Sequence, residues 1–353
     1  MLAMARTRTT LRDVARKVGV HPSTVSRVLN PATRPMVTEA IARRVAAAAE
    51  SLGYHPNPIA YGLKTNRTLT AGVLIPDLNN PVFPPAIRGI EDVFGAVGYT
   101  AILTNTDNDA ERARIAVQKM IARRVDGLIL ATARRRDPVV DYCLAEDIPL
   151  VLINRAPDSS KAPAVVADDV LGVRQTVAHL VALGHRRIAH IAGPPSLSTG
   201  HGRRQAFVEA MRDHGLKAEP RLVVACQAFN EEEGRRAFRE LWSRDRTFTA
   251  ALTANDLFAI GCYDAAAELG LSVPGDVSVT GFNDIRFVDK LKPPLTTVRM
   301  PLYEMGTQAA KALLLRIQHG DGAALSVTLA TELIVRGSTA EARPAKPARG
   351  RVS

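Results

Sequence analysis

The chain has 353 residues, of which 46% are hydrophobic, 23% charged and 5% aromatic, a balance typical of globular proteins. Its length is two to three times the commonest domain size, which excludes a single small module. No stretch is apolar enough for a membrane span or a signal peptide, and the three cysteines fit neither a disulfide framework nor a metal site, so we expect a cytoplasmic protein.

The excess positive charge lies at the two ends of the chain. Residues 1–67 hold 11 Lys and Arg against three acidic residues, and residues 340–353 hold four against one, whereas residues 68–339 are balanced. A dense basic head indicates a polyanionic partner, either DNA or an acidic membrane surface. The alternative is a basic face that only contacts solvent.

Residues 10–30, TLRDVARKVGVHPSTVSRVLN, predict two short helices joined by a tight turn. Thr10 is expected to cap the first helix, which ends at a glycine, and the proline of VHPST opens the second. Ala15, Gly19 and Val25 stand at the offsets of a helix-turn-helix: a small residue at the crossing, glycine in the turn, and a branched residue that locks the helices together.

A third helix is predicted from a cap at Thr38 to Leu52, which completes a small bundle. The second helix presents small hydrogen-bonding side chains and one cation, which suit base edges and phosphates, whereas a helix that packs on protein would more often present Glu and Lys. We therefore expect a DNA-binding face made of Ser23, Thr24, Ser26, Arg27 and Asn30.

The head together with the segments LGYHPN, IAYGLK and AGVLIPDLNNPVF resembles the LacI/GalR family of bacterial transcription regulators, and the likeness continues through most of the chain. It implies that residues 58–64 are a hinge helix that folds on operator DNA, with Leu63 as a minor-groove wedge and Lys64 beside it. Thr10 and His21 join the predicted DNA-binding residues, although the family commonly has Ser at the latter position. The alternative is that the hinge segment is a plain linker.

From residue 71 onward, apolar strand-like runs alternate with helical patterns, which predicts parallel sheets covered by helices on both faces, here two of them. The expected fold is thus an α-helical helix-turn-helix head plus an α/β core of two doubly wound subdomains, periplasmic binding protein-like by the resemblance. The expected parts are a head (1–57), a hinge helix and linker (58–69), an effector-binding and dimerisation domain (70–338) and a basic disordered tail (339–353). Within the core, subdomain 1 should hold about 70–168 and 298–326 and subdomain 2 about 169–297 and 327–338, with one crossing near 293–298.

Ligands of such sheets bind beyond the carboxyl ends of the strands, where this chain places amides, carboxylates, arginines and aromatic rings. These groups suit the hydroxyls and ring of a sugar-like effector. Asn and Asp after a strand also commonly cap the next helix. By the resemblance, the effector pocket is lined by Asn79, Phe83, Arg155, Arg203, Phe229, Asn255 and Asn283.

Enzyme chemistry is not indicated, because GxSxG, GxxxxGK[ST], HExxH and a dinucleotide fingerprint are all missing from the sequence. His179, His185 and His190 do not share one helical face, so core or turn roles are expected rather than a metal site. Asp168 and Asp169 are expected to cap a helix. No cofactor and no metal are predicted.

These patterns together predict a homodimeric, nucleoid-associated regulator, most simply a repressor, that binds palindromic double-stranded operator DNA and responds to a small effector, a sugar or sugar derivative. Effector binding would close the two subdomains and weaken the pairing of the hinge helices. Two alternatives are a transport-type sugar-binding protein and a sugar- or nucleotide-metabolising enzyme. The effector, the operator sequence and the choice between dimer and tetramer stay open.

Overall fold

The structure is a computed structural model that describes residues 9–29, 33–54, 67–320 and 325–343. Contacts divide the chain into two compact units, Met1–Thr68 and Leu69–Ser353. We call them the head and the α/β unit and describe each by itself. Among the described residues, no helix combines the length and the apolar character needed to cross a bilayer.

The head is a three-helix bundle with its own core. The first helix ends where Gly19 adopts a left-handed conformation at φ 72°, which glycine adopts without steric cost, and the second begins at Pro22. Val14, Val25 and Val45, one from each helix, are fully buried together. The helices are α1 (Leu11–Val18), α2 (Pro22–Leu29) and α3 (Glu39–Ser51), with a short 3-10 turn, η1 (Arg34–Met36).

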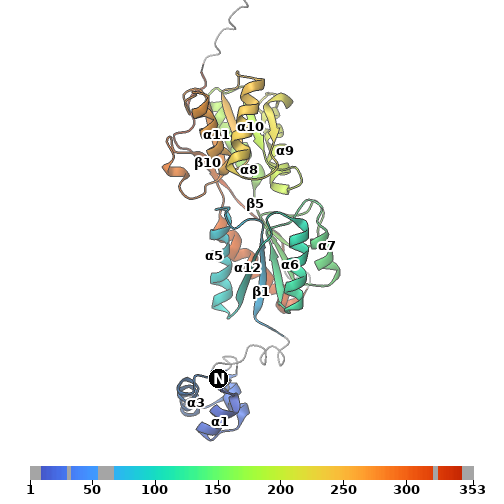
Figure 1. The fold of residues 1–353 in the computed structure, drawn as a ribbon, viewed down its shortest axis with the longest axis vertical. Helices are drawn as coiled ribbons and strands as arrows, with labels where there is room; N and C mark the ends of the chain where they lie inside the picture. Colours follow the sequence, from blue (N-terminus) through green and yellow to red (C-terminus); the bar gives the residue numbers. More distant parts are fainter. Residues whose placement is uncertain (1–8, 30–32, 55–66, 321–324, 344–353) are drawn as a thin grey trace, which may run out of the picture. The chain divides into compact units, whose positions relative to one another are not determined.

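The first sheet of the α/β unit has six strands in the order β11-β5-β4-β3-β1-β2, all parallel. Helices α5 and α12 cover one face, and α6 and α7 cover the other (Figure 1). The strands are β1 (Thr70–Ile75), β2 (Thr100–Asn105), β3 (Gly127–Leu130), β4 (Leu150–Ile153), β5 (Ala164–Ala167) and β11 (Val327–Leu329), and the helices are α5 (Phe83–Ala96), α6 (Ala110–Ala122), α7 (Pro138–Ala145) and α12 (Leu302–His319).

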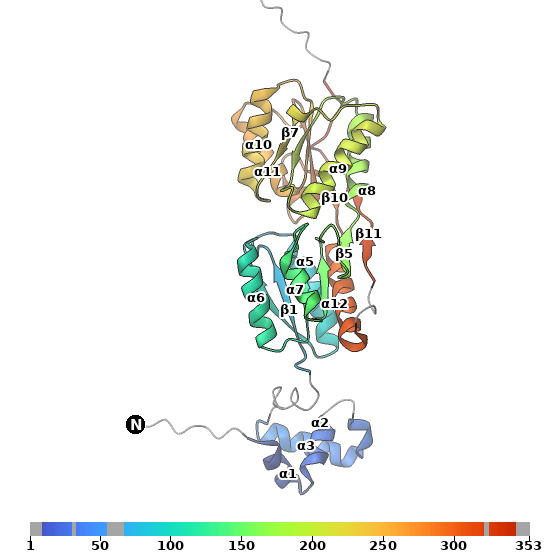
Figure 2. The ribbon, with the colours of Figure 1, turned by 90° about the vertical axis from the view of Figure 1, so that its right-hand side faces the viewer.

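The second sheet repeats this plan in the order β12-β10-β9-β8-β6-β7, in which only β12 is antiparallel to its neighbour. Helices α10 and α11 cover one face, and α8 and α9 the other (Figure 2). The strands are β6 (Ile188–Ala192), β7 (Val223–Ala225), β8 (Ala250–Thr253), β9 (Ser278–Asn283), β10 (Thr296–Arg299) and β12 (Glu332–Ile334), the helices are α8 (Asp169–Ala182), α9 (Ser198–Asp213), α10 (Glu231–Arg244) and α11 (Asp256–Glu268), and two 3-10 turns are η2 (Pro220–Leu222) and η3 (Val288–Lys290).

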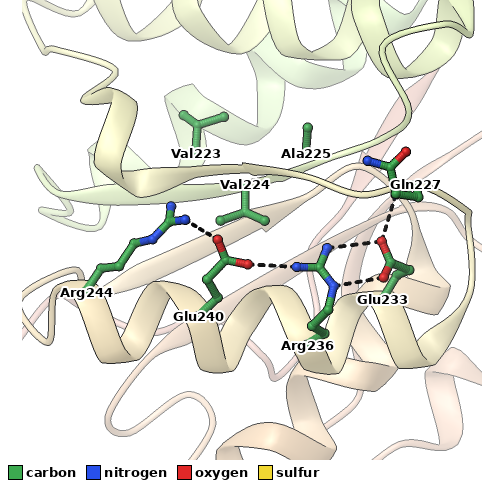
Figure 3. A pocket seen from close by; sticks show the side chains of 8 residues that line it. All are labelled: Val223, Val224, Ala225, Gln227, Glu233, Arg236, Glu240 and Arg244. Atoms are coloured by element: carbon green, nitrogen blue, oxygen red, sulfur yellow. Dashed lines mark hydrogen bonds and ion pairs between the residues drawn. The ribbon is translucent and has the colours of Figure 1, made fainter.

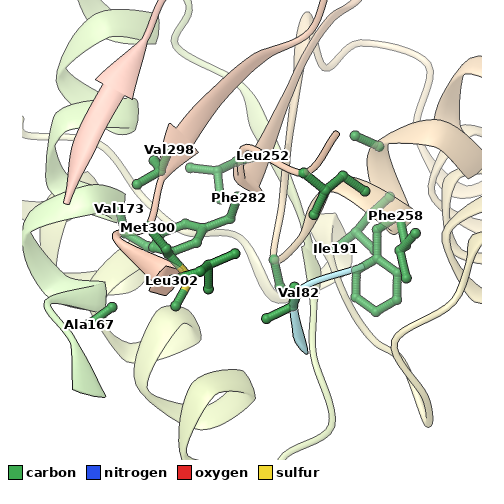
Figure 4. Close-up of a cluster of buried hydrophobic side chains, with 14 of the residues drawn as sticks. Val82, Ala167, Val173, Ile191, Leu252, Phe258, Phe282, Val298, Met300 and Leu302 are labelled. Carbon is green, nitrogen blue, oxygen red and sulfur yellow. The ribbon is translucent and has the colours of Figure 1, made fainter. Parts of the chain in front are cut away.

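We call each sheet with its helices a subdomain. The expected fold class is confirmed: a helical head precedes two parallel-sheet α/β subdomains. The chain passes between the sheets after β5, after β10 and after β11. A continuous apolar core continues through these crossings, where Val173, Phe282 and Val298 gather on one side and Val82 and Leu302 reach it from the first subdomain (Figure 4).

Two expected boundaries between the subdomains are corrected by the strand pairing. The crossing predicted near 293–298 lies after β10, because β10 pairs in parallel with β9 from Thr296 to Arg299. The stretch predicted to enter subdomain 2 at residue 327 is instead β11, which pairs with β5 in the first sheet. Both differences arise because short strands can join either sheet and carry little sequence pattern of their own.

The end of the described chain packs against the second subdomain. The Ser338 hydroxyl donates to the Val279 carbonyl at 2.6 Å, and the Ala342 amide donates to the Leu183 carbonyl at 2.8 Å. Residues 339–343 of the predicted tail are thus bound to the fold rather than disordered. Residues 344–353 lie outside the described part of the chain.

Candidate functional site

The candidate nucleic-acid interface is the outer side of α2. Val25 and Val28 face the core of the head, which turns Ser23 and Arg27 fully outward and leaves Thr24 and Ser26 half-buried. The predicted face is therefore present as one row of small polar side chains and one guanidinium, groups that donate to base edges and phosphates. Asn30, Leu63 and Lys64, also predicted for DNA binding, lie outside the described residues.

The starts of α1 and α2 are fixed by local hydrogen bonds. His21 caps α2: its Nδ1 accepts the Ser23 backbone N–H at 3.2 Å and lies 2.8 Å from the Ser23 hydroxyl oxygen. At α1, the Asp13 carboxylate accepts the Thr10 backbone N–H at 2.9 Å and its hydroxyl at 2.7 Å, and these bonds lower the pKa of Asp13. Histidine thus fills a capping role usually met by Ser, Thr, Asp or Asn.

The second candidate site is a pocket at the carboxyl ends of the two sheets, which we call the cleft pocket. Its volume is about 20 Å³, room for about one water molecule, so side chains or subdomains must move for a larger ligand to enter. Amides and apolar groups line it together with two arginines: Asn80, Val82, Phe83, Asn154, Arg155, Thr199, Arg203, Phe229, Asn255 and Asn283.

Six of the seven predicted effector residues line this pocket, and the seventh, Asn79, does not. The Asp77 carboxylate accepts the Asn79 backbone N–H at 2.8 Å, which forms a tight turn and leaves Asn79 exposed. Its neighbour Asn80 is 8% exposed and enters the pocket instead. In this structure the turn therefore places Asn80 rather than the predicted Asn79 at the pocket, and an effector contact by Asn79 stays a prediction.

Arg203 of α9 is held by the second subdomain from several sides. Its Nε donates to the Asp169 carboxylate at 3.0 Å and its Nη2 forms an ion pair with it at 2.9 Å, its Nη1 donates to the Ala254 carbonyl at 2.6 Å, and its guanidinium lies 3.7 Å from the Phe282 ring centre. Burial raises the pKa of Asp169, and the ion pair opposes that effect. Asp169 was predicted only as a helix cap, so this pairing was missed.

Arg155 enters the same pocket from the loop after β4 in the first subdomain. Asn154 before it adopts a left-handed conformation at φ 66°, which asparagine tolerates, and this turn directs the following residue inward. The Arg155 side chain is 3% exposed and donates from Nη1 to the Asn108 side-chain oxygen at 3.0 Å. The pocket is therefore built from both subdomains.

Asn255 and its neighbour Asp256 connect the pocket to the crossing strands. Asn255 Oδ1 accepts the Phe258 backbone N–H at 2.9 Å, so this residue both caps α11 and lines the pocket. Asp256 accepts the Thr297 hydroxyl at 2.5 Å and the Ile285 backbone N–H at 2.8 Å. Burial raises the pKa of Asp256 to about 6.

Contacts between the subdomains close one side of the cleft. The Arg135 backbone N–H donates to the Ser196 carbonyl at 3.0 Å, and the Ala156 N–H donates to the Ser198 hydroxyl at 3.2 Å. These contacts join the first subdomain to the start of α9, the helix that carries Arg203. Opening of the cleft therefore requires them to break.

A further concavity of about 320 Å³ lies between edge strand β7 and helix α10 (Figure 3). Its charged side chains satisfy one another: Arg236 donates to Glu233 at 2.8 Å and to Glu240 at 2.7 Å, Arg244 also pairs with Glu240, and Glu233 accepts the Gln227 N–H. Because this ladder leaves few groups free for a ligand, the cleft pocket is the stronger candidate site.

Comparison with known proteins covers both units. Residues 10–57 match the family model described as bacterial regulatory proteins, lacI family, and residues 177–339 match a periplasmic binding protein-like domain. The chain is 33% identical to the HTH-type transcriptional repressor CytR of Escherichia coli, over 94% of this chain and 97% of that protein.

Solved structures agree with this match. The chain is similar to the lac repressor dimer bound to operator and the anti-inducer ONPF, with a TM-score of 0.83 and 27% identity over 95% of this chain and 100% of that one. It is also similar to the transcriptional regulator CelR in complex with cellobiose, with a TM-score of 0.71 and 30% identity over 94% of this chain and 100% of that one. The similarity therefore extends over the head and the α/β unit.

Proposed function

Because the chain belongs to the lacI family of bacterial regulatory proteins and is a DNA-binding transcriptional regulator, we propose that it is a homodimeric operator-binding repressor under the control of a small effector. The observation that carries the proposal is the cleft pocket, which Arg155 lines from one subdomain and Arg203 from the other. A ligand that bridges these groups changes the relation of the two subdomains.

In this proposal the outer side of α2 lies in the major groove of one half-site. Ser23, Thr24, Ser26 and Arg27 would contact bases and phosphates, and Thr10 and His21 would contact the DNA backbone at the helix starts. A second copy would bind the other half-site, so the operator is palindromic. Leu63 and Lys64 would act between the half-sites, where paired leucines kink the DNA.

Edge strand β2 is the proposed dimer surface. Leu103 on β2 and Ile115 on the neighbouring helix α6 are each 38% exposed, although both are large and apolar. Ile115 lines a concavity of about 320 Å³ between β2 and α6 together with Ile102 and Thr104, whereas Leu103 points to the opposite face of the strand. A long unpaired edge with apolar neighbours favours association with a second copy.

The proposed effector is a sugar or sugar derivative. CelR, a structural relative, is described with cellobiose bound, and another lacI-family structure is described with ribose bound. The amides of Asn80, Asn255 and Asn283 both donate and accept, as hydroxyl recognition requires, and Phe83 and Phe229 offer ring faces. Effector binding would move the subdomains and lower operator affinity.

We further propose that the protein catalyses no reaction, because its relatives are regulators rather than enzymes. A regulator of this kind works where chromosomal DNA is, so we place it in the bacterial cytoplasm at the nucleoid.

The test starts from an operator selected out of random duplexes with the purified full chain. Fluorescence anisotropy then measures binding of wild type, Arg27→Ala and Arg43→Ala, the last an exposed arginine on α3 that pairs with Glu39. We expect a palindromic selected site and a loss of about 1–3 kcal/mol for Arg27→Ala on operator but not on random DNA. Equal losses on both DNAs would reassign Arg27 to phosphate contact.

Control by an effector is measured in the same assay. Sugars and sugar derivatives that raise the melting temperature of the protein are added to the operator complex, and a change in operator affinity of roughly 5- to 150-fold is expected for the true effector. If every compound that binds the α/β unit leaves operator affinity unchanged, the proposed control is wrong. A selection that returns no symmetric site would contradict the homodimer.

A further inference from the structure

The ionisable groups among the residues lining the cleft pocket are two arginines, Arg155 and Arg203. No Asp or Glu lines the pocket in the described part of the chain. The polar groups beside them are four neutral asparagines and one threonine. The charge balance of the pocket therefore depends on what each arginine contacts outside it.

Arg203 is neutralised by the protein itself. Its guanidinium forms an ion pair with Asp169, to which Nε donates, and it also donates to the Ala254 carbonyl and, from Nη2, to the Met300 sulfur at 3.6 Å, and lies on the Phe282 ring. Nε donates to the Asp169 carboxylate and Nη2 lies 2.9 Å from the same carboxylate oxygen, so the acid faces the side-on edge of Arg203. Arg203 is thus a fixed wall of the pocket with its charge already paired.

Arg155 is equally buried but has no such partner. Among the residues that the structure describes, its side chain makes one hydrogen bond, from Nη1 to the uncharged Asn108, and its buried Nε meets no partner. No ion pair to Arg155 is found among the described residues, and Arg134 and Arg203 add positive charge nearby. The Nε and Nη2 side of Arg155 therefore faces no carboxylate of any described residue, whereas the same side of Arg203 faces Asp169.

An unpaired buried cation is costly. Burial, together with repulsion from Arg203 and Arg134, lowers the pKa of Arg155 to about 10. A neutral hydroxyl satisfies a hydrogen bond but leaves the charge uncompensated, whereas an anionic oxygen satisfies both. The geometry and the charge balance therefore both favour a negative group at this edge.

We infer that the effector carries an anionic oxygen group, a carboxylate or a phosphate, that binds side-on to Nε and Nη2 of Arg155. The rest of the molecule is a polyol recognised by the asparagine amides, so the ligand class is a sugar acid or a sugar phosphate. This inference rests on the proposed function only in taking the cleft pocket as the effector site. Beyond the proposed function, the inference specifies that the effector carries a negative charge, which neutral sugars lack.

The first test needs no ligand. Arg155→Met removes a charge without a counterion, whereas the matched Arg203→Met leaves Asp169 buried and unpaired. We expect the melting temperature of the unliganded full chain to stay equal or rise by about 2 °C in Arg155→Met and to fall by several degrees in Arg203→Met. A comparable fall in both variants would show that the Arg155 charge is already compensated and would overturn the inference.

The second test compares acids with their neutral parents by thermal shift and calorimetry. The pairs are gluconate and glucuronate with glucose, galacturonate with galactose, and ribose 5-phosphate with ribose. At least one acid or phosphate should bind tenfold or more tightly than its parent, and Arg155→Met should abolish that preference. The pairs that respond distinguish a carboxylate ligand from a phosphate ligand.

The outcomes separate this inference from the proposed function. A neutral sugar that binds as tightly as its acid and releases operator DNA would remove the anionic effector and keep the regulated repressor. Failure of every acid and phosphate to bind would also overturn the inference. An acid that binds through Arg155 without any effect on operator affinity would support the inference and contradict the proposed regulation.

Discussion

The two subdomains share one strand order but differ in how they hold their polar groups. Apart from the late strands β11 and β12, the orders β5-β4-β3-β1-β2 and β10-β9-β8-β6-β7 are the same plan used twice. In the second subdomain, Arg203 of the cleft pocket and Asp256 behind it are already bound by protein partners. In the first, Arg155 has a single neutral partner. The same strand order thus carries a fully bonded arginine, Arg203, on one side of the cleft and an arginine without an ion pair among the described residues, Arg155, on the other.

The largest effect is expected from a change in a feature that both subdomains share, a pair of helices packed closely at a glycine. Both join a helix pair at glycines: a Cβ on Gly89 of α5 would lie 2.3 Å from the Tyr303 carbonyl oxygen of α12, and one on Gly261 of α11 would lie 2.0 Å from the Glu231 carbonyl oxygen of α10. Gly89→Ala should therefore force the helices apart and lower the free energy of unfolding by about 3 kcal/mol. Urea unfolding followed by circular dichroism measures the loss.

The control lies in the same helix. A Cβ on Gly95 of α5 meets no atom within 4 Å, so Gly95→Ala should be neutral or stabilise by up to about 1 kcal/mol through better helix propensity. If Gly89→Ala is as benign as Gly95→Ala, close helix approach does not hold the first subdomain together.

A buried histidine distinguishes β6 from β1, the strand at the equivalent place in the other sheet. β1 is apolar from Ala71 to Ile75, whereas β6 buries His190, whose Nδ1 donates to the Leu252 carbonyl while Nε2 has no partner. Burial lowers the pKa of His190 from its ordinary 6.5 to about 4. The unfolded chain therefore takes up a proton below pH 6.5 that the native state refuses, so this contribution to stability is present above pH 6.5 and lost as the pH falls toward 4.

Acidification from pH 7 to pH 5 should cost wild type about 2 kcal/mol more than His190→Leu, since a tenfold difference in proton affinity corresponds to about 1.4 kcal/mol. Asp256 has a raised pKa, so acidification over the same range stabilises the folded state through this residue. Both proteins contain Asp256, so its effect cancels when their free energies of unfolding are compared. Urea unfolding at both pH values measures it. Parallel pH profiles would mean that His190 does not titrate between folded and unfolded states in this way.

The edge strands give the third contrast. β2 has six residues and exposes Leu103, whereas β7 has three residues and lies beside the ion-pair ladder of α10. Leu103→Lys should weaken dimer association at least tenfold, because a charge would be buried in the proposed interface. Sedimentation velocity measures the association, and Val208→Lys, at a 45% exposed residue of α9, is the control. Equal association of both variants with wild type would place the dimer surface elsewhere.

Features of this fold that depend on neighbouring residues could be predicted from the sequence, whereas features that depend on residues far apart in the chain could not. Helix starts were confirmed where caps act locally, as at Thr10 and Asp168, whose carboxylate accepts the Leu171 N–H. The strands β5, β10, β11 and β12 at the crossings were not predicted as strands, because their place in a sheet is set by partners far along the chain.

The site was limited in the same way. The order of residues after a strand predicted most of the cleft pocket, but a single turn decided that Asn80 rather than Asn79 enters it. The pairing of Asp169 with Arg203 joins residues 34 apart, and the vacancy at Arg155 exists only because no acid arrives from any other described element. Charge balance in a pocket is a property of the folded chain and has no local signal.

The smallest expected effect concerns the joint between the subdomains. The Ser198 hydroxyl, at the start of α9, accepts the Ala156 N–H of the first subdomain, so Ser198→Ala removes one hydrogen bond across the cleft. Such a bond contributes about 1 kcal/mol, which should speed hydrogen exchange of the Ala156 amide about fivefold. Ser243→Ala is the matched control, because that hydroxyl donates to the Glu240 carbonyl of its own helix. An unchanged exchange rate at Ala156 would mean that other contacts across the cleft keep the two subdomains closed.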